Sequence, residues 1–371
     1  MPIKPFKLER YFAQYEFKVK FLLSASDCES LPMAELLQMA APESLDLWNG
    51  LKLGYTESQG HPLLRAEISR LYQHVSPENV IVAAPEEAIF IAMQTLLTPD
   101  DHVIVLSPAY QSLYEIARSI GCRVTPWKLE AGANGWQLDL GQLERSITDN
   151  TRMIVINFPH NPTGYLLSNR ALDSVIEIAR KNNLYLFSDE MYRLLEYDPE
   201  TQLPPVCDLY EKGISLSGLS KAFALPGLRI GWLATQESSL IERWIAFKDY
   251  TTICSSAPSE ILGIIALQNK DRILQRSLAI VRENMNIARR FFAKHEDQFS
   301  WFSPMAGSVA FPRWEGTGSV EQFCHDILDQ QGVMIVPGSL FEYPGNHFRV
   351  GLGRKNLREA LEHVNGYLEK F

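Results

Sequence analysis

The clearest chemical pattern in this chain is a lysine followed by an arginine eight positions later. Lys221 opens a glycine-bounded loop and Arg229 lies near its end, within the run Ser220–Gly231. An amine beside a guanidinium suits a ligand that offers a carbonyl carbon to the amine and an anionic group to the guanidinium. A lone lysine in a loop is usually only solvated, so the prediction of a site depends on other polar groups.

Two clusters of polar residues lie upstream of Lys221, each directly after a short apolar run that is typical of a buried strand. Asn157–Gly164 follows the run 151–156, and Ser188–Tyr192 follows the run 184–187. The loop of Lys221 follows a similar run. Because ligands of an open parallel sheet bind beyond the carboxyl ends of its strands, the three clusters are predicted to converge on one site.

The elements that must position these clusters alternate in type from about residue 62 to residue 235. Helical spacing alternates with short β-branched runs, which favours an α/β fold with a mostly parallel sheet covered by helices on both faces. Helices are expected over 63–75, 86–97, 113–120 and 171–181, and strands over 102–106, 123–128, 151–157, 184–187 and 214–217.

The pattern changes after about residue 236. Long helical stretches, including 276–295 and a closing helix over 356–371, surround short strands at 308–311 and 347–350. This predicts a smaller α+β domain. We expect a large domain over 49–258 and a small domain built from both termini, 1–48 and 259–371.

Composition excludes several kinds of partner and site. With 371 residues, 46% of them hydrophobic, and a net charge of −9, the chain can bury a large core, and neither nucleic acid nor an anionic membrane is expected as its main partner. Its five cysteines show no metal-ligand spacing, so no metal site is predicted. The first residues lack the apolar stretch of a signal peptide, and the cytoplasm is the expected location.

In this order, the three polar clusters resemble the class I/II aminotransferases, which are fold-type-I pyridoxal-phosphate enzymes. The similarity extends from about Gly54 to Gly351 and is most specific at Asn161–Gly164 and around Lys221. The resemblance implies pyridoxal 5'-phosphate as cofactor, an amino acid and a 2-oxo acid as substrates, and a homodimer with shared active sites.

The resemblance also implies roles around the cofactor ring. Lys221 would form the Schiff base and move the proton between the substrate Cα and the cofactor C4′, aided by a pKa that burial lowers. Asp189 would pair with the pyridine nitrogen and keep it protonated. Asn161 and Tyr192 would donate hydrogen bonds to the phenolate oxygen, and Tyr110 would stack on the ring.

Further residues would hold the phosphate and the substrate. Arg229 would bind the phosphate, with the Ser220 hydroxyl beside the lysine and Tyr55 reaching the phosphate from the other subunit. Arg349 would bind the substrate α-carboxylate, because a guanidinium fork matches a planar carboxylate. Asn161 would also line the substrate site.

Each of these residues has a simpler structural explanation. Asp189 could cap the turn after its strand, Tyr110 and Tyr192 could be core aromatics, and Arg349 could belong to a surface ion pair.

The chain departs from the family pattern at the phosphate end of the site. Where relatives have a glycine-alanine-threonine type of turn, this chain has Ala83–Ala88, with Pro85 suited to a first helical position. Glu86 follows at the positive end of that helix, where at about 4 Å and a dielectric near 20 it would repel a phosphate by about 4 kcal/mol. We therefore expect its side chain to turn away, leaving Pro85 and Glu86 as backbone neighbours of the phosphate.

Gly218 is the second departure, because many relatives have a serine hydroxyl at this position. Together the two departures predict fewer side-chain donors to the phosphate than in typical relatives. Binding should then depend more on Arg229 and Tyr55.

The motifs leave the reaction open. An aminotransferase is the leading hypothesis, and a carbon–sulfur β-lyase, a decarboxylase or a cyclising enzyme of amino-acid metabolism would share the same groups. The differences should lie in substrate loops at 23–27, 250–256 and 307–309. A cofactor-binding sensor domain would need a basic domain before Gly54, and about 50 residues leave little room for it. The sequence has no second arginine with a clear match for a side-chain carboxylate. Strict specificity for aspartate or glutamate is therefore not expected.

Overall fold

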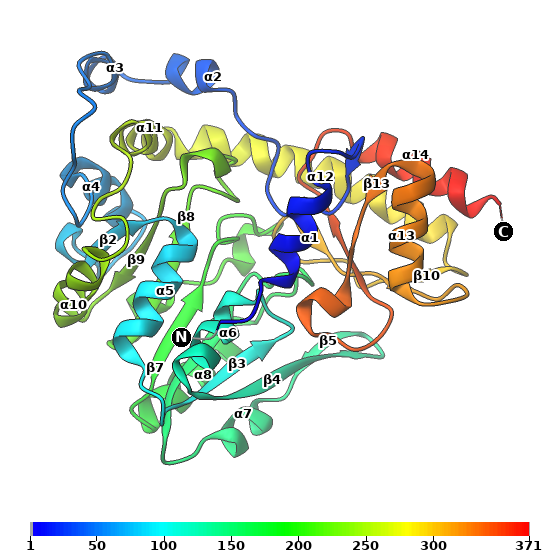
Figure 1. The fold of residues 1–371 in the computed structure, drawn as a ribbon, viewed down its shortest axis with the longest axis horizontal. Coiled ribbons are helices and arrows are strands. Elements are labelled where there is room, and N and C mark those ends of the chain that lie inside the picture. The colour runs from blue at the N-terminus through cyan, green and yellow to red at the C-terminus, as the bar shows by residue number, and fades with distance from the viewer. Residues whose placement is uncertain (1–2, 371) are drawn as a thin grey trace.

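An eight-stranded sheet forms the centre of the computed structural model, which describes residues 3–370 (Figure 1). Five neighbouring strands, β8-β7-β6-β3-β4, are parallel, whereas β2, β9 and β5 are antiparallel to their neighbours. The predicted mostly parallel sheet is therefore confirmed. In spatial order the strands are β2 (Val80–Ala83), β9 (Gly231–Thr235), β8 (Gly213–Gly218), β7 (Tyr185–Asp189), β6 (Thr151–Asn157), β3 (His102–Ser107), β4 (Arg123–Gly132) and β5 (Gly135–Leu138).

Helices cover both faces of this sheet, because successive side chains of each strand point to opposite sides. In β3, Val103 and Val105 join the core under α5, α6 and α10, whereas Ile104 and Leu106 join the core under α7, α8 and α9. The helices are α5 (Pro85–Leu96), α6 (Ser112–Ile120), α10 (Ser238–Lys248), α7 (Leu140–Ser146), α8 (Asn169–Lys181) and α9 (Val206–Leu209).

Local sequence fixes where the helices begin and end. Pro85 occupies the first turn of α5, as expected. The Ser168 side chain accepts a hydrogen bond from the amide of Ala171 at 3.2 Å and so caps α8. The helix expected over 63–75 is shorter than predicted, because α4 (Pro62–Ser69) ends six residues before Val75. Short 3₁₀ turns occur at η1 (Pro77–Asn79), η2 (Pro199–Thr201), η3 (Pro226–Leu228) and η4 (Gly338–Phe341).

The C-terminal part combines long helices with short strands, as predicted. An aromatic core that includes Phe299, Trp314, Phe323 and Phe348 holds these elements together. The helices are α11 (Ala257–Gln268), α12 (Lys270–Lys294), α13 (Val320–Gln331) and α14 (Leu357–Leu368), and the strands are β10 (Phe299–Ser300), β11 (Val309–Ala310), β12 (Arg313–Trp314), β13 (Val333–Met334), β14 (Val336–Pro337) and β15 (Phe348–Gly351). The last residue of the expected closing helix, 371, lies outside the described residues.

The N-terminal segment packs against this C-terminal part. Strand β1 (Phe21–Leu22) pairs in parallel with β13. Helix α1 (Lys7–Tyr15) contacts η4, and Figure 1 draws it in blue beside the orange C-terminal elements. Helices α2 (Met33–Gln38) and α3 (Pro42–Asn49) pack on α11. These contacts are those that a small domain made from both termini requires, and the domain boundaries stay a prediction.

Two glycines let the N-terminal segment lie close to strand β15 of the three-stranded sheet. The amide of Gly351, at the end of β15, donates a hydrogen bond to the carbonyl of Leu23 at 2.6 Å. A Cβ atom on Gly351 would overlap the carbonyl oxygen of Ala25, and one on Gly353 would overlap that of Asp27. Only glycine therefore allows residues 23–27 to run beside this strand.

Two further observations concern the cysteines and the length of the helices. All five cysteines are free. Within residues 3–370, no helix combines the length and the apolar character that a membrane span requires.

Candidate active site

A cavity of about 420 Å³ opens beyond the carboxyl ends of β6, β7 and β8. The structure brings together at this cavity ten of the eleven predicted site residues and leaves Tyr55 outside it. The ten are Pro85, Glu86, Tyr110, Asn161, Asp189, Tyr192, Ser220, Lys221, Arg229 and Arg349. The three clusters thus share one space, and the roles assigned to their side chains stay predictions.

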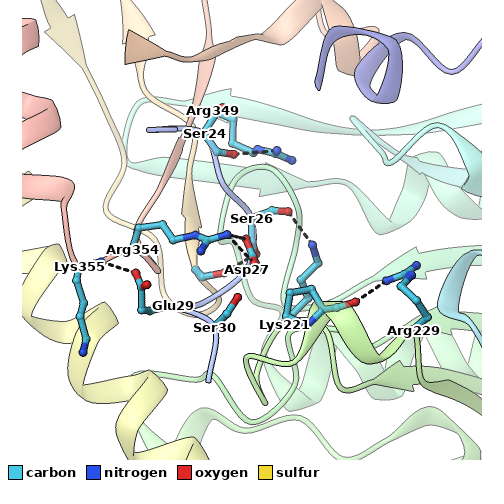
Figure 2. Close-up of polar contacts among 12 residues, drawn as sticks. Ser24, Ser26, Asp27, Glu29, Ser30, Lys221, Arg229, Arg349, Arg354 and Lys355 are labelled. Carbon is cyan, nitrogen blue, oxygen red and sulfur yellow. Dashed lines mark hydrogen bonds and ion pairs between the residues drawn. The ribbon is translucent and has the colours of Figure 1, made fainter. Parts of the chain in front are cut away.

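The amine of Lys221 points into this cavity from the loop after β8. Its Nζ atom donates a hydrogen bond to Oγ of Ser26 at 2.7 Å, as Figure 2 shows. Burial lowers the pKa of the amine. Among the described residues no carboxylate forms an ion pair with it. A buried amine without a counterion loses its proton more easily, and the neutral amine is the form that attacks a carbonyl carbon.

Asp189 ends β7 with its side chain buried. Its Oδ1 atom accepts a hydrogen bond from the amide of Met191 at 3.1 Å, so the carboxylate does cap the following turn. Burial raises its pKa to about 6. A carboxylate held in this way is still ionised at neutral pH and can hold a proton on a ring nitrogen.

Asn161 and Tyr192 belong to the same wall. Asn157 fixes the backbone here, because its Oδ1 accepts from the amide of Asn161 and its Nδ2 donates to the carbonyl of Asp189, both at 2.8 Å. The buried hydroxyl of Tyr192 donates to the carbonyl of Ser26 at 2.9 Å. It is therefore a core aromatic that also lines the cavity.

Arg349 comes from β15 and is buried, with 1% of its surface exposed. Its Nη1 donates to Oδ1 of Asn161 at 3.3 Å and its Nη2 donates to the carbonyl of Ser24 at 2.9 Å. Its Nε has no hydrogen-bond partner, and no carboxylate of the described chain pairs with it. The surface ion pair considered from the sequence is therefore wrong. A buried guanidinium without an anion is costly, which makes this position suited to a ligand carboxylate.

The groups near the start of α5 fit a phosphate. Arg229 follows η3 in a left-handed conformation, with φ of 55°, and Nη1 donates to the carbonyl of Pro226 at 3.0 Å. The hydroxyl of Ser220 is buried and has no hydrogen-bond partner within residues 3–370. Pro85 begins the helix at the same cavity. An unsatisfied hydroxyl, a guanidinium and a helix N-terminus are the donors that a phosphate prefers.

Gly218, the second departure from the family pattern, has a packing reason. It lies opposite Gly231 in the register of β8 and β9. A Cβ atom on Gly218 would come within 3.0 Å of the Gly231 Cα atom and the Ile230 carbonyl oxygen. A Cβ atom on Gly231 would in turn lie 2.8 Å from the ring of Pro85. A side chain at 218 would therefore require the backbone of β9 to move by a few tenths of an ångström.

Replacing Arg229 with alanine is expected to release most of the cofactor on dialysis. Loss of a charge-assisted contact should raise the Kd for pyridoxal phosphate about 10- to 150-fold. Equilibrium dialysis with detection at the cofactor's visible band measures it. Arg229→Lys is the matched control, since it keeps the charge and the same backbone demand. An alanine variant that holds cofactor as tightly as the lysine variant would contradict the prediction.

Glu86 lies in the first turn of α5, and its side chain accepts a hydrogen bond from α6. Its Oε2 accepts from Oγ of Ser112 at 3.3 Å, and its side chain lines both the cavity and a neighbouring groove. Burial raises its pKa to about 7. The expectation that it turns away from the phosphate stays a prediction.

The ionisation of Glu86 gives a pH test. Below pH 7 the carboxyl group is mainly neutral, and above pH 7 it is an anion beside the phosphate site. We compare the Kd of the wild-type protein for pyridoxal phosphate with the Kd of the Glu86→Gln variant. The wild-type Kd divided by the variant Kd should be near one at pH 6 and should rise about 5-fold at pH 8, because the wild-type carboxylate then repels the phosphate. Titrations by absorption at several pH values measure it. A flat ratio would mean that the carboxylate does not act on the phosphate.

Several residues at the cavity were missed by sequence reasoning. Ser26 and Asp27 lie in the segment 23–27, which was predicted only as a substrate loop, and Asp27 pairs with Arg354 at 2.8 Å. Glu9 and Glu16 enter from α1 and its C-terminal cap. The sequence pattern that could have identified the α1 residues is the spacing of Leu8, Glu9, Phe12 and Glu16. This spacing places their side chains on one helical face.

Tyr55 lies outside the cavity, with 90% of its side chain exposed. Its loop is held from below, because Nζ of the buried Lys248 donates to the carbonyls of Ser58 and Val82, both at 2.7 Å. An exposed tyrosine on a loop that is tied to β2 through Lys248 is compatible with a contact to a second subunit. The role of Tyr55 stays a prediction.

Comparison with known proteins shows the family. Residues 18–364 match the model of the family "Aminotransferase class I and II". The chain therefore belongs to the class I/II aminotransferases, as the resemblance implied.

Individual relatives differ in their reactions. Capreomycidine synthase from Streptomyces vinaceus is 30% identical over 98% of this chain and 92% of its own length. A PLP-dependent aminotransferase from Streptococcus suis 89-1591 has a TM-score of 0.92 and 32% identity, with 100% of this chain and 99% of that chain covered. The PLP-dependent cyclase OrfR has a TM-score of 0.91 and 26% identity, with 100% and 98% covered.

Proposed function

We propose that this protein is a pyridoxal-phosphate-dependent aminotransferase that moves the amino group of an amino acid to a 2-oxo acid. The observation that supports it most is that the Lys221 amine and the buried Arg349 guanidinium face one cavity without a carboxylate partner in the described chain. An amine for a carbonyl carbon and a guanidinium for a carboxylate are what amino transfer requires.

Pyridoxal phosphate supplies a carbonyl group for the amino nitrogen and a ring that accepts electrons. Arg229, Ser220 and the start of α5 would hold its phosphate, and Asp189 would keep a proton on the ring nitrogen. Arg349 holds the substrate by its α-carboxylate and thereby fixes the direction of the Cα–H bond. Lys221, whose pKa burial lowers, would take the proton from the substrate Cα with Nζ and deliver it to the cofactor C4′.

The partners follow from the same proposal. Amino acids and 2-oxo acids share the α-carboxylate that Arg349 binds, so both half-reactions use one site. A homodimer is expected if Tyr55 completes the phosphate site of the partner subunit.

A cyclising enzyme is the second candidate. It is favoured by the likeness to capreomycidine synthase and to the cyclase OrfR over nearly the whole chain. Removal of the Cα proton by Lys221 begins both reactions. The two reactions differ in their later steps, because a cyclase keeps the amino group in its product and consumes no 2-oxo acid.

The decisive experiment is absorption spectroscopy of the purified protein with pyridoxal phosphate, before and after addition of a panel of amino acids. Conversion of the cofactor to its pyridoxamine form, with a 2-oxo acid found by mass spectrometry, supports amino transfer. A cyclic product formed without consumption of an acceptor supports the second candidate. Release of pyruvate and ammonia would indicate the lyase instead.

A further inference from the structure

Helix α1 presents two carboxylates to the active-site cavity. Leu8, Glu9, Phe12 and Glu16 all line it, and their spacing places them along one face of α1. Lys7 lies off this face and pairs with Glu342 at 3.2 Å. This face therefore offers apolar surface between two acidic groups and contributes no cation to the cavity.

The two carboxylates have no counterion of their own. Glu9 accepts a hydrogen bond from the hydroxyl of Tyr110 at 2.8 Å, and neither Glu9 nor Glu16 forms an ion pair in the described chain. The neighbouring Asp27 is already paired with Arg354. Burial and the charges of Asp27 and Glu9 raise the pKa of Glu16, whereas the charges of Arg354 and Lys221 lower it, so these groups lie close together.

The opposite charge comes from β15, where the Arg349 guanidinium lies 5.8 Å from the ring of Phe12. Arg349 is almost completely buried and its Nε has no hydrogen-bond partner within residues 3–370, so it independently indicates a ligand with a carboxylate. With the α-carboxylate held by Arg349 and the amino group held at Lys221, the substrate side chain remains for Glu9 and Glu16. Arg349 is thus assigned to the α-carboxylate of the ligand, and the α1 carboxylates before and after Phe12 are assigned to its side chain.

We propose that the amino-acid substrate has a positively charged side chain, whose methylene groups lie on Leu8 and Phe12 and whose terminal cation binds Glu9 and Glu16. This inference rests on the proposed function, because it assumes that Arg349 receives the α-carboxylate. A methylene stem beside apolar side chains and a cation beside unpaired carboxylates satisfy both kinds of surface on α1. Acidic side chains such as those of aspartate and glutamate are repelled at this position.

The test compares substrates that differ in charge but little in shape. The protein loaded with pyridoxal phosphate is titrated with L-arginine and L-citrulline, and with L-lysine and L-norleucine, and Kd is taken from the change in the cofactor spectrum. We expect each cationic amino acid to bind at least about 10-fold more tightly than the neutral amino acid of its pair. In the double variant Glu9→Gln, Glu16→Gln the preference should fall to near one, with the Kd for L-citrulline unchanged. Glu43→Gln, on the exposed face of α3, is the control and should keep the preference.

The outcomes separate this inference from the proposed function. A cation preference that depends on Glu9 and Glu16 supports the inference even if no 2-oxo acid forms and amino transfer is excluded. Amino transfer from neutral or acidic amino acids, without a preference for the cations, overturns the inference and leaves amino transfer in place. A cation preference that survives in the double variant also overturns it.

Discussion

Replacement of Lys221 with alanine is expected to lower amino transfer by about 10⁴-fold or more, because among the described residues Lys221 is the one lysine that lines the cavity. Within residues 3–370 its Nζ atom has only Ser26 Oγ as hydrogen-bond partner, so removal of the amine leaves one hydroxyl to be resolvated and should hardly change stability. Single-turnover absorption measurements with the loaded protein give the rate, and thermal unfolding gives the stability.

Ser26→Ala is the matched control for this variant. It removes the hydrogen bond to Nζ but keeps the amine, and should cost no more than about 10-fold in rate. If Lys221→Ala and Ser26→Ala lose similar activity, the lysine has a structural role and the assignment of the proton transfer to it is wrong.

Replacement of Arg349 with lysine is expected to reduce kcat/KM by about 10²- to 10³-fold for amino acids and 2-oxo acids alike. The ammonium keeps the charge but loses the fork that matches a carboxylate, and it leaves Asn161 Oδ1 and the Ser24 carbonyl with fewer donors. The Kd for pyridoxal phosphate should stay within about twofold, since Arg349 is assigned to the substrate.

A substrate without a carboxylate tests whether the effect of the substitution comes from the contact between Arg349 and the substrate carboxylate. For a simple alkylamine the wild-type reaction should already be slow, and Arg349→Lys should not slow it further. A variant that slows the amine and the amino acid equally would show that Arg349 maintains the fold of the cavity wall rather than binding the substrate.

The central sheet was predictable because its signals are local. Buried parallel strands such as β6 and β7 are short apolar runs, and polar residues follow at their ends. Antiparallel β9 was not expected, because Gly231–Thr235 looks the same whichever direction its neighbours run. The direction of a strand depends on the connection before it, here the loop of Lys221 and Arg229.

The missed part of the site depends on contacts between distant residues. Asn161, Asp189 and Lys221 follow strands of one sheet, so the order of the strands places them together. Ser26 reaches the cavity only because Gly351 lets the N-terminal segment approach β15, and no local pattern in the sequence indicates that approach. Single-chain motifs likewise cannot place Tyr55, whose predicted partner is a second copy.

Synthesis of this chain must pass Arg354 before its active-site cavity can close. Phe21 pairs with Val333 and Asp27 with Arg354, and Ser26 lies between these two attachments. Residues 21–27 therefore dock only after residues 333–354 have left the ribosome. Because such distant contacts form slowly, this segment should dock after the central sheet has folded. A growing chain then carries no complete active site until residues 333–354 have been made.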